Sequence, residues 1–265
     1  MTMEQLWLRR FQPVVNPRIT LIGLPHAGGA ASFFLPLSRS LPDGIELAAV
    51  QYPGRQDRYR EPPLTSIRAF AGRLAGVLVG TPGLVLFGHS MGAIVGFEVI
   101  RLLEQCGERC LGLVASGCRA PTLTQDNGVH RHDDDALILE TRRLGGTDTR
   151  VLDDDEMRAH ILPALRADYT AIETYRAEPG AVVHCPVSVL VGDADRRVSV
   201  AAAHEWRSAT TEPFSLDVLP GGHFFLTARP ADVRDTLCAR IAAFEQEARD
   251  RGSAERGSGV SHRPL

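Results

Sequence analysis

Lysine is absent from this chain of 265 residues, so all 29 basic side chains are arginines. Catalysis through a lysine Schiff base or a lysine general base is therefore excluded. The basic residues are outnumbered by 32 acidic ones, which gives a formal net charge of −3. Because proteins that bind nucleic acids usually carry a basic surface, this balance argues against that class.

Long hydrophobic runs are also absent, since no stretch of about 18 apolar residues occurs, and we expect no membrane span. The first ten residues lack the basic and then apolar pattern of a signal peptide, so we expect a cytoplasmic protein. The cysteines are few, scattered and without a C-x-x-C pair, at Cys106, Cys110, Cys118, Cys185 and Cys238. We therefore expect neither a disulfide framework nor a structural zinc site.

The sequence does contain a regular alternation of apolar segments. Short, β-branched apolar runs predict strands at residues 18–24, 45–51, 84–87, 111–115, 187–191 and 214–219. Helical spacing of apolar residues predicts helices at 32–40, 67–79, 94–103 and 231–248. Because strands alternate with helices, we predict an α/β fold with a mostly parallel central sheet and helices on both faces.

One long segment interrupts this alternation. It contains no convincing strand, and its pattern predicts helices at 136–144 and 157–175. An insertion of that length between two strands is often a lid. The predicted organisation is a core from 1–117 and 187–248, a helical lid insertion at 118–186, and a disordered tail at 249–265, which is rich in Gly, Ser and Arg.

Residues 88–92 read Gly-His-Ser-Met-Gly and match the G-x-S-x-G pattern. In this pattern the chain turns sharply from a strand into a helix, and the two glycines remove side chains that would clash. The serine then lies at the helix N-terminus, exposed and near the positive end of the helix dipole. Because a predicted strand precedes the motif and a predicted helix follows it, we interpret Ser90 as a nucleophile.

A serine hydroxyl needs a base, and in hydrolases with this motif the chain order is serine, acid, histidine. Of the nine histidines, only His223 follows a late strand on a glycine loop. Two candidate acids, Asp193 and Asp195, follow the strand at 187–191. We favour Asp195, which lies further beyond the strand, to orient His223, and expect Asp193 to cap the turn.

The oxyanion of an acyl-transfer intermediate needs two backbone N–H donors. Met91, which follows the serine, is the first candidate. The second is Ala27, in the glycine-containing loop after the first predicted strand. The alternative for this loop is that its glycines serve only the geometry of the turn.

Two other kinds of site remain open by pattern. The segment His130-Arg-His132-Asp-Asp-Asp135 offers metal-ligand types, but polar clusters on an insertion are usually solvated, so we expect no metal and no cofactor. Paired carboxylates of the glycosidase type are not excluded, although no such pair follows a predicted strand.

With these residues placed, the chain resembles the stand-alone type II thioesterases of polyketide and nonribosomal peptide biosynthesis. The resemblance extends from about residue 6 to about residue 245. It is carried by Leu-Pro-His-Ala-Gly-Gly (24–29), Gln-Tyr-Pro-Gly-Arg-Gln (51–56), Gly-His-Ser-Met-Gly (88–92), Leu-Pro-Ala-Leu-Arg-Ala-Asp-Tyr (162–169), Gly-Asp-Ala-Asp (192–195) and Gly-Gly-His-Phe (221–224). It implies an α/β-hydrolase fold with a helical lid, and it supports Ser90, Asp195 and His223 as a catalytic triad.

The resemblance also implies hydrolysis of acyl groups from the phosphopantetheine arm of carrier proteins, usually to clear aberrant units from a synthase. We expect the chain to be a monomer that meets acyl or peptidyl carrier domains in trans. Arg55, Arg58 and Arg60 form one candidate patch for an acidic carrier or the phosphate of the arm. The alternative is that Arg55 is a structural ion-pair partner and the other two are solvated.

Apolar residues of the predicted lid are candidates for lining the acyl chamber, although packing against the core would explain most of them: Leu137, Leu139, Leu144, Ile161, Leu165 and Ile172. The rival functions are a carboxylesterase or lipase with the same triad, an acyltransferase, a dedicated acyl-release thioesterase, and a non-catalytic binding protein. Haloalkane dehalogenases and epoxide hydrolases are disfavoured because they need a carboxylate at position 90.

Overall fold

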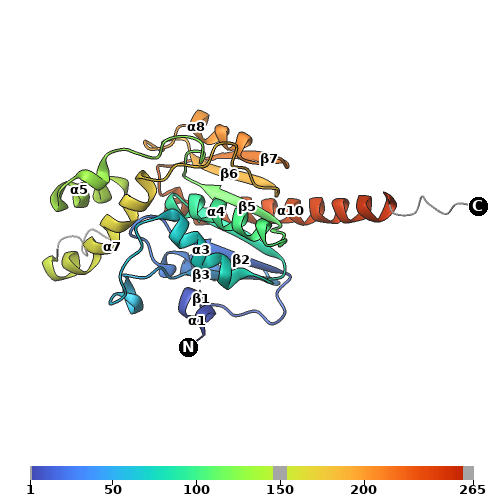
Figure 1. Ribbon diagram of the computed structural model, residues 1–265, viewed down its shortest axis with the longest axis horizontal. Helices are drawn as coiled ribbons and strands as arrows, with labels where there is room; N and C mark the ends of the chain where they lie inside the picture. Colours follow the sequence, from blue (N-terminus) through green and yellow to red (C-terminus); the bar gives the residue numbers. More distant parts are fainter. Residues whose placement is uncertain (1, 146–153, 259–265) are drawn as a thin grey trace, which may run out of the picture.

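The computed structural model of the protein describes residues 2–145 and 154–258 and contains a seven-stranded sheet (Figure 1). The order across the sheet is β1-β3-β2-β4-β5-β6-β7. Every neighbouring pair is parallel except β1 and β3. The strands are β1 Leu8–Arg10, β2 Ile19–Leu24, β3 Ile45–Val50, β4 Leu84–His89, β5 Gly112–Ser116, β6 Val187–Gly192 and β7 Phe214–Leu219. The predicted mostly parallel sheet is confirmed.

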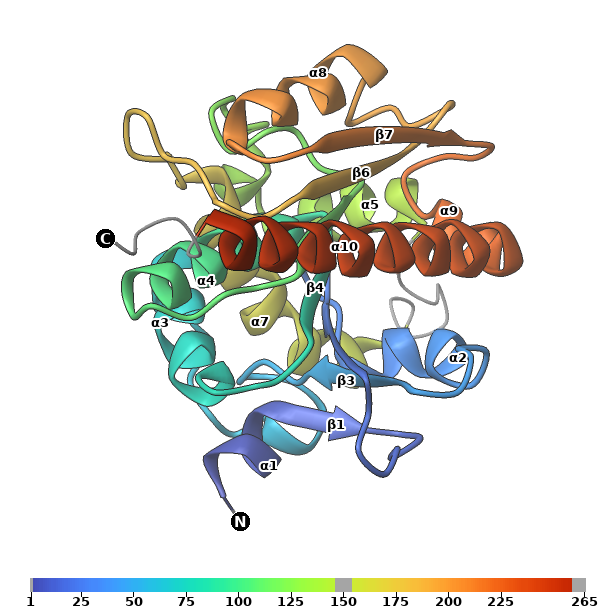
Figure 2. The ribbon, with the colours of Figure 1, turned by 90° about the vertical axis from the view of Figure 1, so that its right-hand side faces the viewer.

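Helices cover both faces of this sheet. Helices α3 and α4 pack on one face, and α10 crosses the other (Figure 2). The α-helices are α1 Met3–Trp7, α2 Leu35–Ser38, α3 Ile67–Leu78, α4 Met91–Gln105, α5 Asp134–Leu144, α7 Asp155–Glu173, α8 Val200–His204, α9 Phe225–Ala228 and α10 Pro230–Ser258. Short 3-10 turns are η1 Ala31–Phe34, η2 Gln56–Arg58, η3 Val129–Arg131 and η4 Glu205–Ala209.

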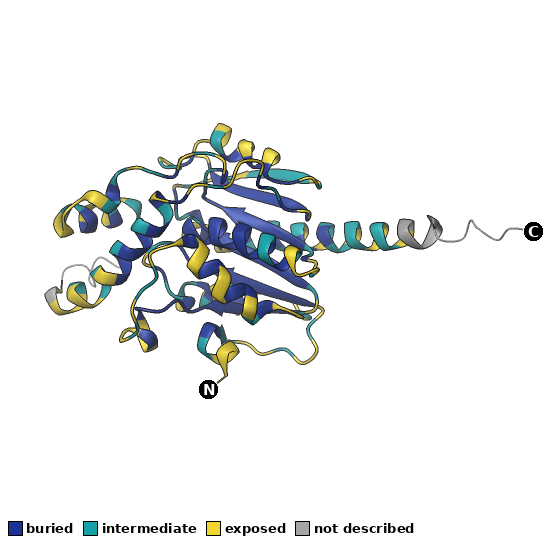
Figure 3. Ribbon diagram, viewed as in Figure 1, coloured by how far each residue is buried: buried dark blue, intermediate teal, exposed yellow. Residues whose placement is uncertain are grey.

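The central strands are buried on both faces, which explains their continuous apolar sequences. In β2, Ile22 and Leu24 belong to the hydrophobic cluster beneath α3 and α4, whereas Ile19 and Leu21 belong to the cluster beneath α10. Figure 3 shows the strands as the most continuously buried part of the molecule. The sheet is therefore a rigid platform for the loops that follow its strands.

Two elements differ from the sequence-based expectation. The edge strand β1 was not predicted, because it has only three residues and two of them are arginines. The prediction of a disordered tail from residue 249 is wrong for residues 249–258, which continue α10. Polar contacts support this extension, since Arg251 pairs with Glu212 at 2.7 Å and Gln246 donates to Asp250 at 2.8 Å. Residues 259–265 of the predicted tail lie outside the described residues.

The segment between β5 and β6 contains η3, α5 and α7, and in its described part no strand, as the sequence predicts. Its helices lie at the end of the sheet where the loops after β2 and β4 emerge (Figure 1). The boundaries at 118 and 186 stay a prediction. Among the described residues, no helix combines the length and the apolar character needed to cross a membrane.

Candidate active site

Ser90 lies at the apex of the turn between β4 and α4, with φ 53° and ψ −119°. A non-glycine residue rarely adopts a positive φ, so this conformation is strained and must be imposed by its surroundings. The flanking glycines show how: a Cβ at Gly88 would lie 2.3 Å from the carbonyl carbon of Gly92. A Cβ at Gly92 would lie 2.0 Å from the oxygen of Leu24. The predicted strand–turn–helix geometry is therefore present.

His223 and Asp195 are joined at the ends of neighbouring strands. The Nδ1 atom of His223 lies 2.9 Å from Oδ2 of Asp195, whose side chain is fully buried. The other carboxylate oxygen accepts the backbone N–H groups of Arg197 at 2.8 Å and Val198 at 3.2 Å. This arrangement orients the imidazole, and both His223 and Ser90 line one cavity of about 60 Å³.

Asp193, the acid not favoured by the sequence analysis, has a different partner. Its Oδ1 accepts the N–H of Gly221 at 2.8 Å, two residues before His223. A Cβ at Gly192 would lie 2.3 Å from the oxygen of Gly221. Asp193 therefore does not cap its own turn, as was expected, but bonds to the loop that carries His223.

The two candidate oxyanion donors line the same cavity as Ser90. In the loop after β2, Gly28 donates its N–H to Asp168 at 2.7 Å and Gly29 donates to the oxygen of His26 at 2.9 Å. In contrast, the N–H groups of Ala27 and Met91 have no acceptor within the described part of the chain. Both are thus available to an incoming oxygen.

Two further histidines, His26 and His89, lie beside the cavity but are unsuited to act as a base. Burial, assisted by the neighbouring His223, lowers the pKa of His26 to about 3. Burial also lowers the pKa of His89 well below its usual value, and its Nδ1 contacts Ser116 Oγ at 3.1 Å. Both imidazoles are neutral at physiological pH, which leaves His223 as the candidate base.

Asp168 of α7 is a site residue that sequence reasoning missed. Its fully buried carboxylate receives Arg55 in a two-pronged ion pair, at 2.6 and 2.9 Å, in addition to the N–H of Gly28. The available signal was an acidic residue on an apolar helix face, four residues after Ala164 and three before Ala171, both of which are buried.

The same contact corrects the candidate docking patch. Arg55 is buried, so the alternative of a structural ion-pair partner is confirmed. Arg58 is also buried, where it pairs with Glu61 and donates to the oxygen of Gln51. Neither arginine is presented to a partner's surface. The alternative that Arg58 is solvated is therefore wrong, whereas Arg60 is exposed.

The six apolar residues proposed for the acyl chamber lie in four different places. Leu144 and Ile172 line the cavity beside Ser90. Leu137 and Leu165 are buried in a small cluster with Val129 and Tyr169 instead, and Leu139 is 49% exposed. Ile161 lines a second, larger cavity.

This second cavity has a volume of about 630 Å³ and lies between the first half of α7 and the loops after β2 and β3. His26 lines both cavities and so forms part of the wall between them. The other lining residues are Gly28, Gly29, Ala30, Ser32, Phe33, Arg55, Gln56, Tyr59, Met157, His160, Ile161 and Ala164.

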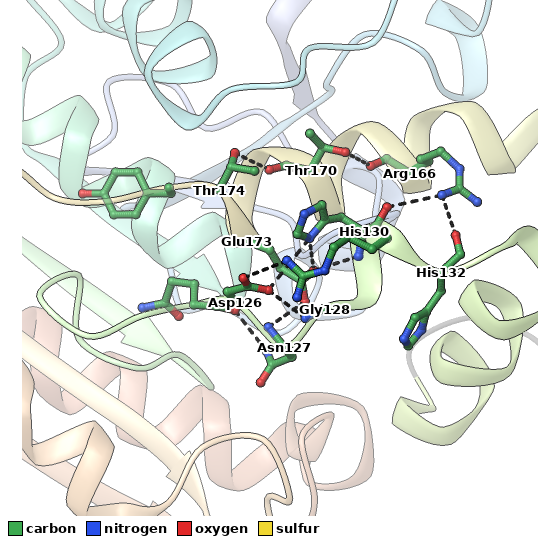
Figure 4. A network of polar contacts seen from close by, with 12 residues as sticks. Asp126, Asn127, Gly128, His130, His132, Arg166, Thr170, Glu173 and Thr174 are labelled. Atoms are coloured by element: carbon green, nitrogen blue, oxygen red, sulfur yellow. Dashed lines mark hydrogen bonds and ion pairs between the residues drawn. The ribbon is translucent and has the colours of Figure 1, made fainter.

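The segment considered for metal ligands is engaged in internal contacts (Figure 4). His130 joins Glu173 at 2.7 Å, and these two with Asp126 bring three ligand atoms within 4.8 Å of one another. Glu173 also accepts hydrogen bonds from the backbone N–H groups of Asn127 and His130, and so fixes the position of the loop that leads into η3. The three aspartates that follow His132 cap α5 or pair with arginines of α7: Asp133 with Ala136 N–H, Asp134 with Arg166 and Asp135 with Arg158.

Comparison with known proteins identifies the family of this fold and site. A family model described as thioesterase domain matches residues 19–244. The chain is 48% identical over 227 residues to Thioesterase PikA5 of Streptomyces venezuelae, which covers 83% of this chain and 80% of that protein.

Solved structures agree with this match. The type II thioesterase BorB from the borrelidin biosynthetic cluster has a TM-score of 0.82 and 40% identity, over 89% of this chain and 98% of that one. YbtT, a type II thioesterase from the yersiniabactin NRPS/PKS pathway, has a TM-score of 0.80 and 31% identity, over 91% and 98%. The predicted α/β-hydrolase fold and the resemblance to type II thioesterases are confirmed.

Proposed function

The chain belongs to the thioesterase family, and we propose that it hydrolyses acyl thioesters on the phosphopantetheine arms of carrier proteins, acting in trans on a polyketide or nonribosomal peptide synthase. One observation carries the proposal. A strained serine, at φ 53°, shares a cavity with a histidine that is held 2.9 Å from a buried carboxylate. This arrangement is that of a serine nucleophile with an oriented base.

In the first step, Nε2 of His223 takes the proton of Ser90 Oγ as the oxygen attacks the thioester carbonyl. Asp195 holds the proton on Nδ1 and stabilises the imidazolium that forms. The oxyanion accepts the N–H groups of Met91 and Ala27. The C–S bond then breaks, the pantetheine sulfur leaves with the proton from His223, and the acyl group remains on Ser90.

In the second step, His223 takes a proton from water, which attacks the acyl-serine carbonyl. The same two N–H groups stabilise the second oxyanion, and His223 returns the proton to Ser90 Oγ as the carboxylic acid leaves. Each oxyanion donor is worth about 10²–10³-fold in rate in such sites. Little leaving-group assistance is needed, because a thiolate leaves more easily than an alkoxide.

The size of the cavity supports release of short acyl groups. Its volume of about 60 Å³ is roughly a tenth of the volume of the second cavity, about 630 Å³. A short acyl unit fits such a space, as expected of an enzyme that clears stalled or decarboxylated units. The second candidate is dedicated release of one longer product, whose acyl chain would bind in the cavity of about 630 Å³.

The test is hydrolysis of a panel of acyl groups loaded on a phosphopantetheinylated carrier protein, with wild type, Ser90→Ala and the matched control Ser40→Ala. Ser40 is exposed and is not among the residues that line either cavity. Broad release of short groups, abolished only by Ser90→Ala, supports the proposal. Fast release of one chain length favours a dedicated release enzyme. Equal rates for wild type and Ser90→Ala would contradict the proposed nucleophile.

Two further comparisons separate the remaining rivals. Matched oxyesters and thioesters distinguish a carboxylesterase, since clear preference for the oxyester would contradict a thioesterase. Product analysis with added alcohols and amines distinguishes an acyltransferase, because transfer in place of hydrolysis would show that water is not the natural acceptor.

A further inference from the structure

One buried ion pair holds the Gly28-Gly29 dipeptide at both ends, through the N–H of Gly28 and the C=O of Gly29. Asp168 Oδ2 accepts the N–H of Gly28 at 2.7 Å and Nη1 of Arg55 at 2.6 Å. The same Nη1 donates to the oxygen of Gly29 at 3.0 Å, and Nη2 of Arg55 donates to Asp168 Oδ1 at 2.9 Å. Three segments distant in sequence therefore meet on this carboxylate.

The loop that receives these contacts needs a glycine at position 28. Gly28 has φ +76°, and the position of a Cβ on it would lie 2.6 Å from Cδ1 of Leu165. Helix α7 thus packs beside the loop through Leu165. One turn further on, its Asp168 accepts the N–H of Gly28. Gly28 is directly bonded to Ala27, which lines the cavity beside Ser90.

We propose that Asp168 is a positioning residue for the oxyanion hole. By holding the N–H of Gly28, and the oxygen of Gly29 through Arg55, it sets the direction in which the Ala27 N–H points. The packing of the second half of α7 against this loop is therefore required for stabilisation of the tetrahedral intermediate. The inference rests on the proposed serine mechanism and adds a residue that touches neither substrate nor Ser90.

The chemistry of the pair explains why a carboxylate is needed. Asp168 accepts three hydrogen bonds, two of them from a charged guanidinium, and such charge-assisted forks are strong and directional. An asparagine keeps one acceptor but leaves Arg55 buried without its counter-charge, which destabilises a protein. Replacing both partners by apolar residues of similar volume is often tolerated. The double replacement therefore separates folding from positioning.

The experiment compares wild type, Asp168→Asn and the double variant Arg55→Met with Asp168→Leu. The matched control is Glu98→Gln, because Glu98 is also a buried carboxylate, paired with Arg101 and Tyr175, but has no contact with the loop at 26–29. Active sites are first counted by labelling Ser90 with a fluorophosphonate. We then measure kcat and KM per active site on an acyl-carrier substrate, and the inhibition constant of an alkyl boronic acid, which forms a tetrahedral adduct with the serine.

For both Asp168 variants we expect kcat per active site to fall about 10- to 100-fold with KM changed less than about threefold, because one oxyanion donor is misdirected. The boronic acid should weaken in the same proportion. Glu98→Gln should keep wild-type kcat per active site. If the Asp168 variants only reduce the labelled fraction and keep kcat and boronic acid affinity within about threefold, the proposal is overturned.

This design separates the inference from the proposed substrate. If wild type does not hydrolyse acyl carriers, the substrate class is wrong, yet the boronic acid still reports the oxyanion hole through Ser90. If wild type hydrolyses them and the Asp168 variants do so equally well per active site, the function stands and the positioning role fails.

Discussion

The two halves of α7, on either side of Pro163, differ in almost every physical property. Residues 164–173 are mostly buried, and they contribute Tyr169, Ile172 and Glu173 to the lining of the cavity beside Ser90. The described side chains in 154–162 are exposed or half-buried, as the yellow and teal turns of Figure 3 show. We call these segments the inner half and the outer half of α7.

Pro163 lies where α7 changes from exposed to buried. Proline has no N–H, so the hydrogen bond to the oxygen of Ala159 cannot form, and its ring disturbs the preceding turn. The helix is therefore weakest at the point where burial begins. The comparison teaches that one helix serves as core at one end, behind Ser90, and as the cover of the larger cavity at the other.

The largest expected effect is a difference in unfolding free energy between truncating one side chain in the inner half and one in the outer half. Leu165→Ala should lower the free energy of unfolding by about 2–4 kcal/mol, because it deletes a buried side chain and leaves a cavity. Met157→Ala, its counterpart in the outer half, is 45% exposed and should cost less than about 0.5 kcal/mol. Urea unfolding curves measure both, and equal losses would show that the halves do not differ in burial energy.

Acidification should destabilise the protein through two buried histidines, His26 and His89. Burial lowers the pKa of His26 to about 3 and that of His89 well below its usual value. Because the unfolded state then binds more protons below about pH 6.5, stability falls as the pH falls. Between pH 7.5 and 5.5 each histidine should account for about 1.3 kcal/mol of lost unfolding free energy.

The measurement is urea unfolding at both pH values, for wild type and His89→Asn. The pH-dependent loss should be about 2.6 kcal/mol in wild type and about half of that in the variant. A loss of the same size in both proteins would mean that His89 is not the neutral, buried group that the structure shows.

Replacing Pro163 by alanine tests whether the proline weakens α7 between its two halves. Pro163→Ala restores a backbone donor, and we expect a gain of about 1–2 kcal/mol in unfolding free energy, the helix effect being partly offset by a more flexible unfolded chain. Hydrogen exchange should show more protection for residues 154–162 than in wild type. Unchanged stability and protection would mean that proline does not limit the outer half.

The smallest expected effect concerns the outer half alone. Ile161→Ala enlarges the cavity of about 630 Å³ without opening the wall behind Ser90. We expect kcat/KM for longer acyl chains to change about two- to fivefold relative to short ones, which is about 0.4–1 kcal/mol. A competition assay with two chain lengths on the same carrier measures the ratio, and an unchanged ratio would remove this cavity from substrate selection.

The buried strands and the turn at Ser90 were predictable because each is specified by a short continuous stretch of sequence. The buried strands are uninterrupted apolar runs, and the Gly88-x-Ser90-x-Gly92 turn allows few other residues at its positions. The order of serine, acid and histidine limited the acid to Asp193 or Asp195, and Asp195 was favoured because it lies further beyond the strand. In the structure its Oδ2 lies 2.9 Å from Nδ1 of His223.

Other features depend on contacts between distant segments, which a local pattern does not encode. Asp168 and Arg55 are 113 positions apart, and each resembles a solvated surface charge in its own segment. The three-residue strand β1 pairs with β3 although its own sequence has little apolar character. The helical end of α10 was mistaken for disorder because its polar residues form contacts that composition does not show.

The most direct test of the whole account is capture of the covalent intermediate. Wild type and His223→Ala are mixed rapidly with an acyl-carrier substrate, quenched in acid and analysed by mass spectrometry of the intact protein and its peptides. The account predicts a mass increase equal to the acyl group, confined to the peptide that carries Ser90, in wild type, with little adduct in His223→Ala. Release of free acid with no acylation of Ser90, or an adduct on another residue, would contradict it.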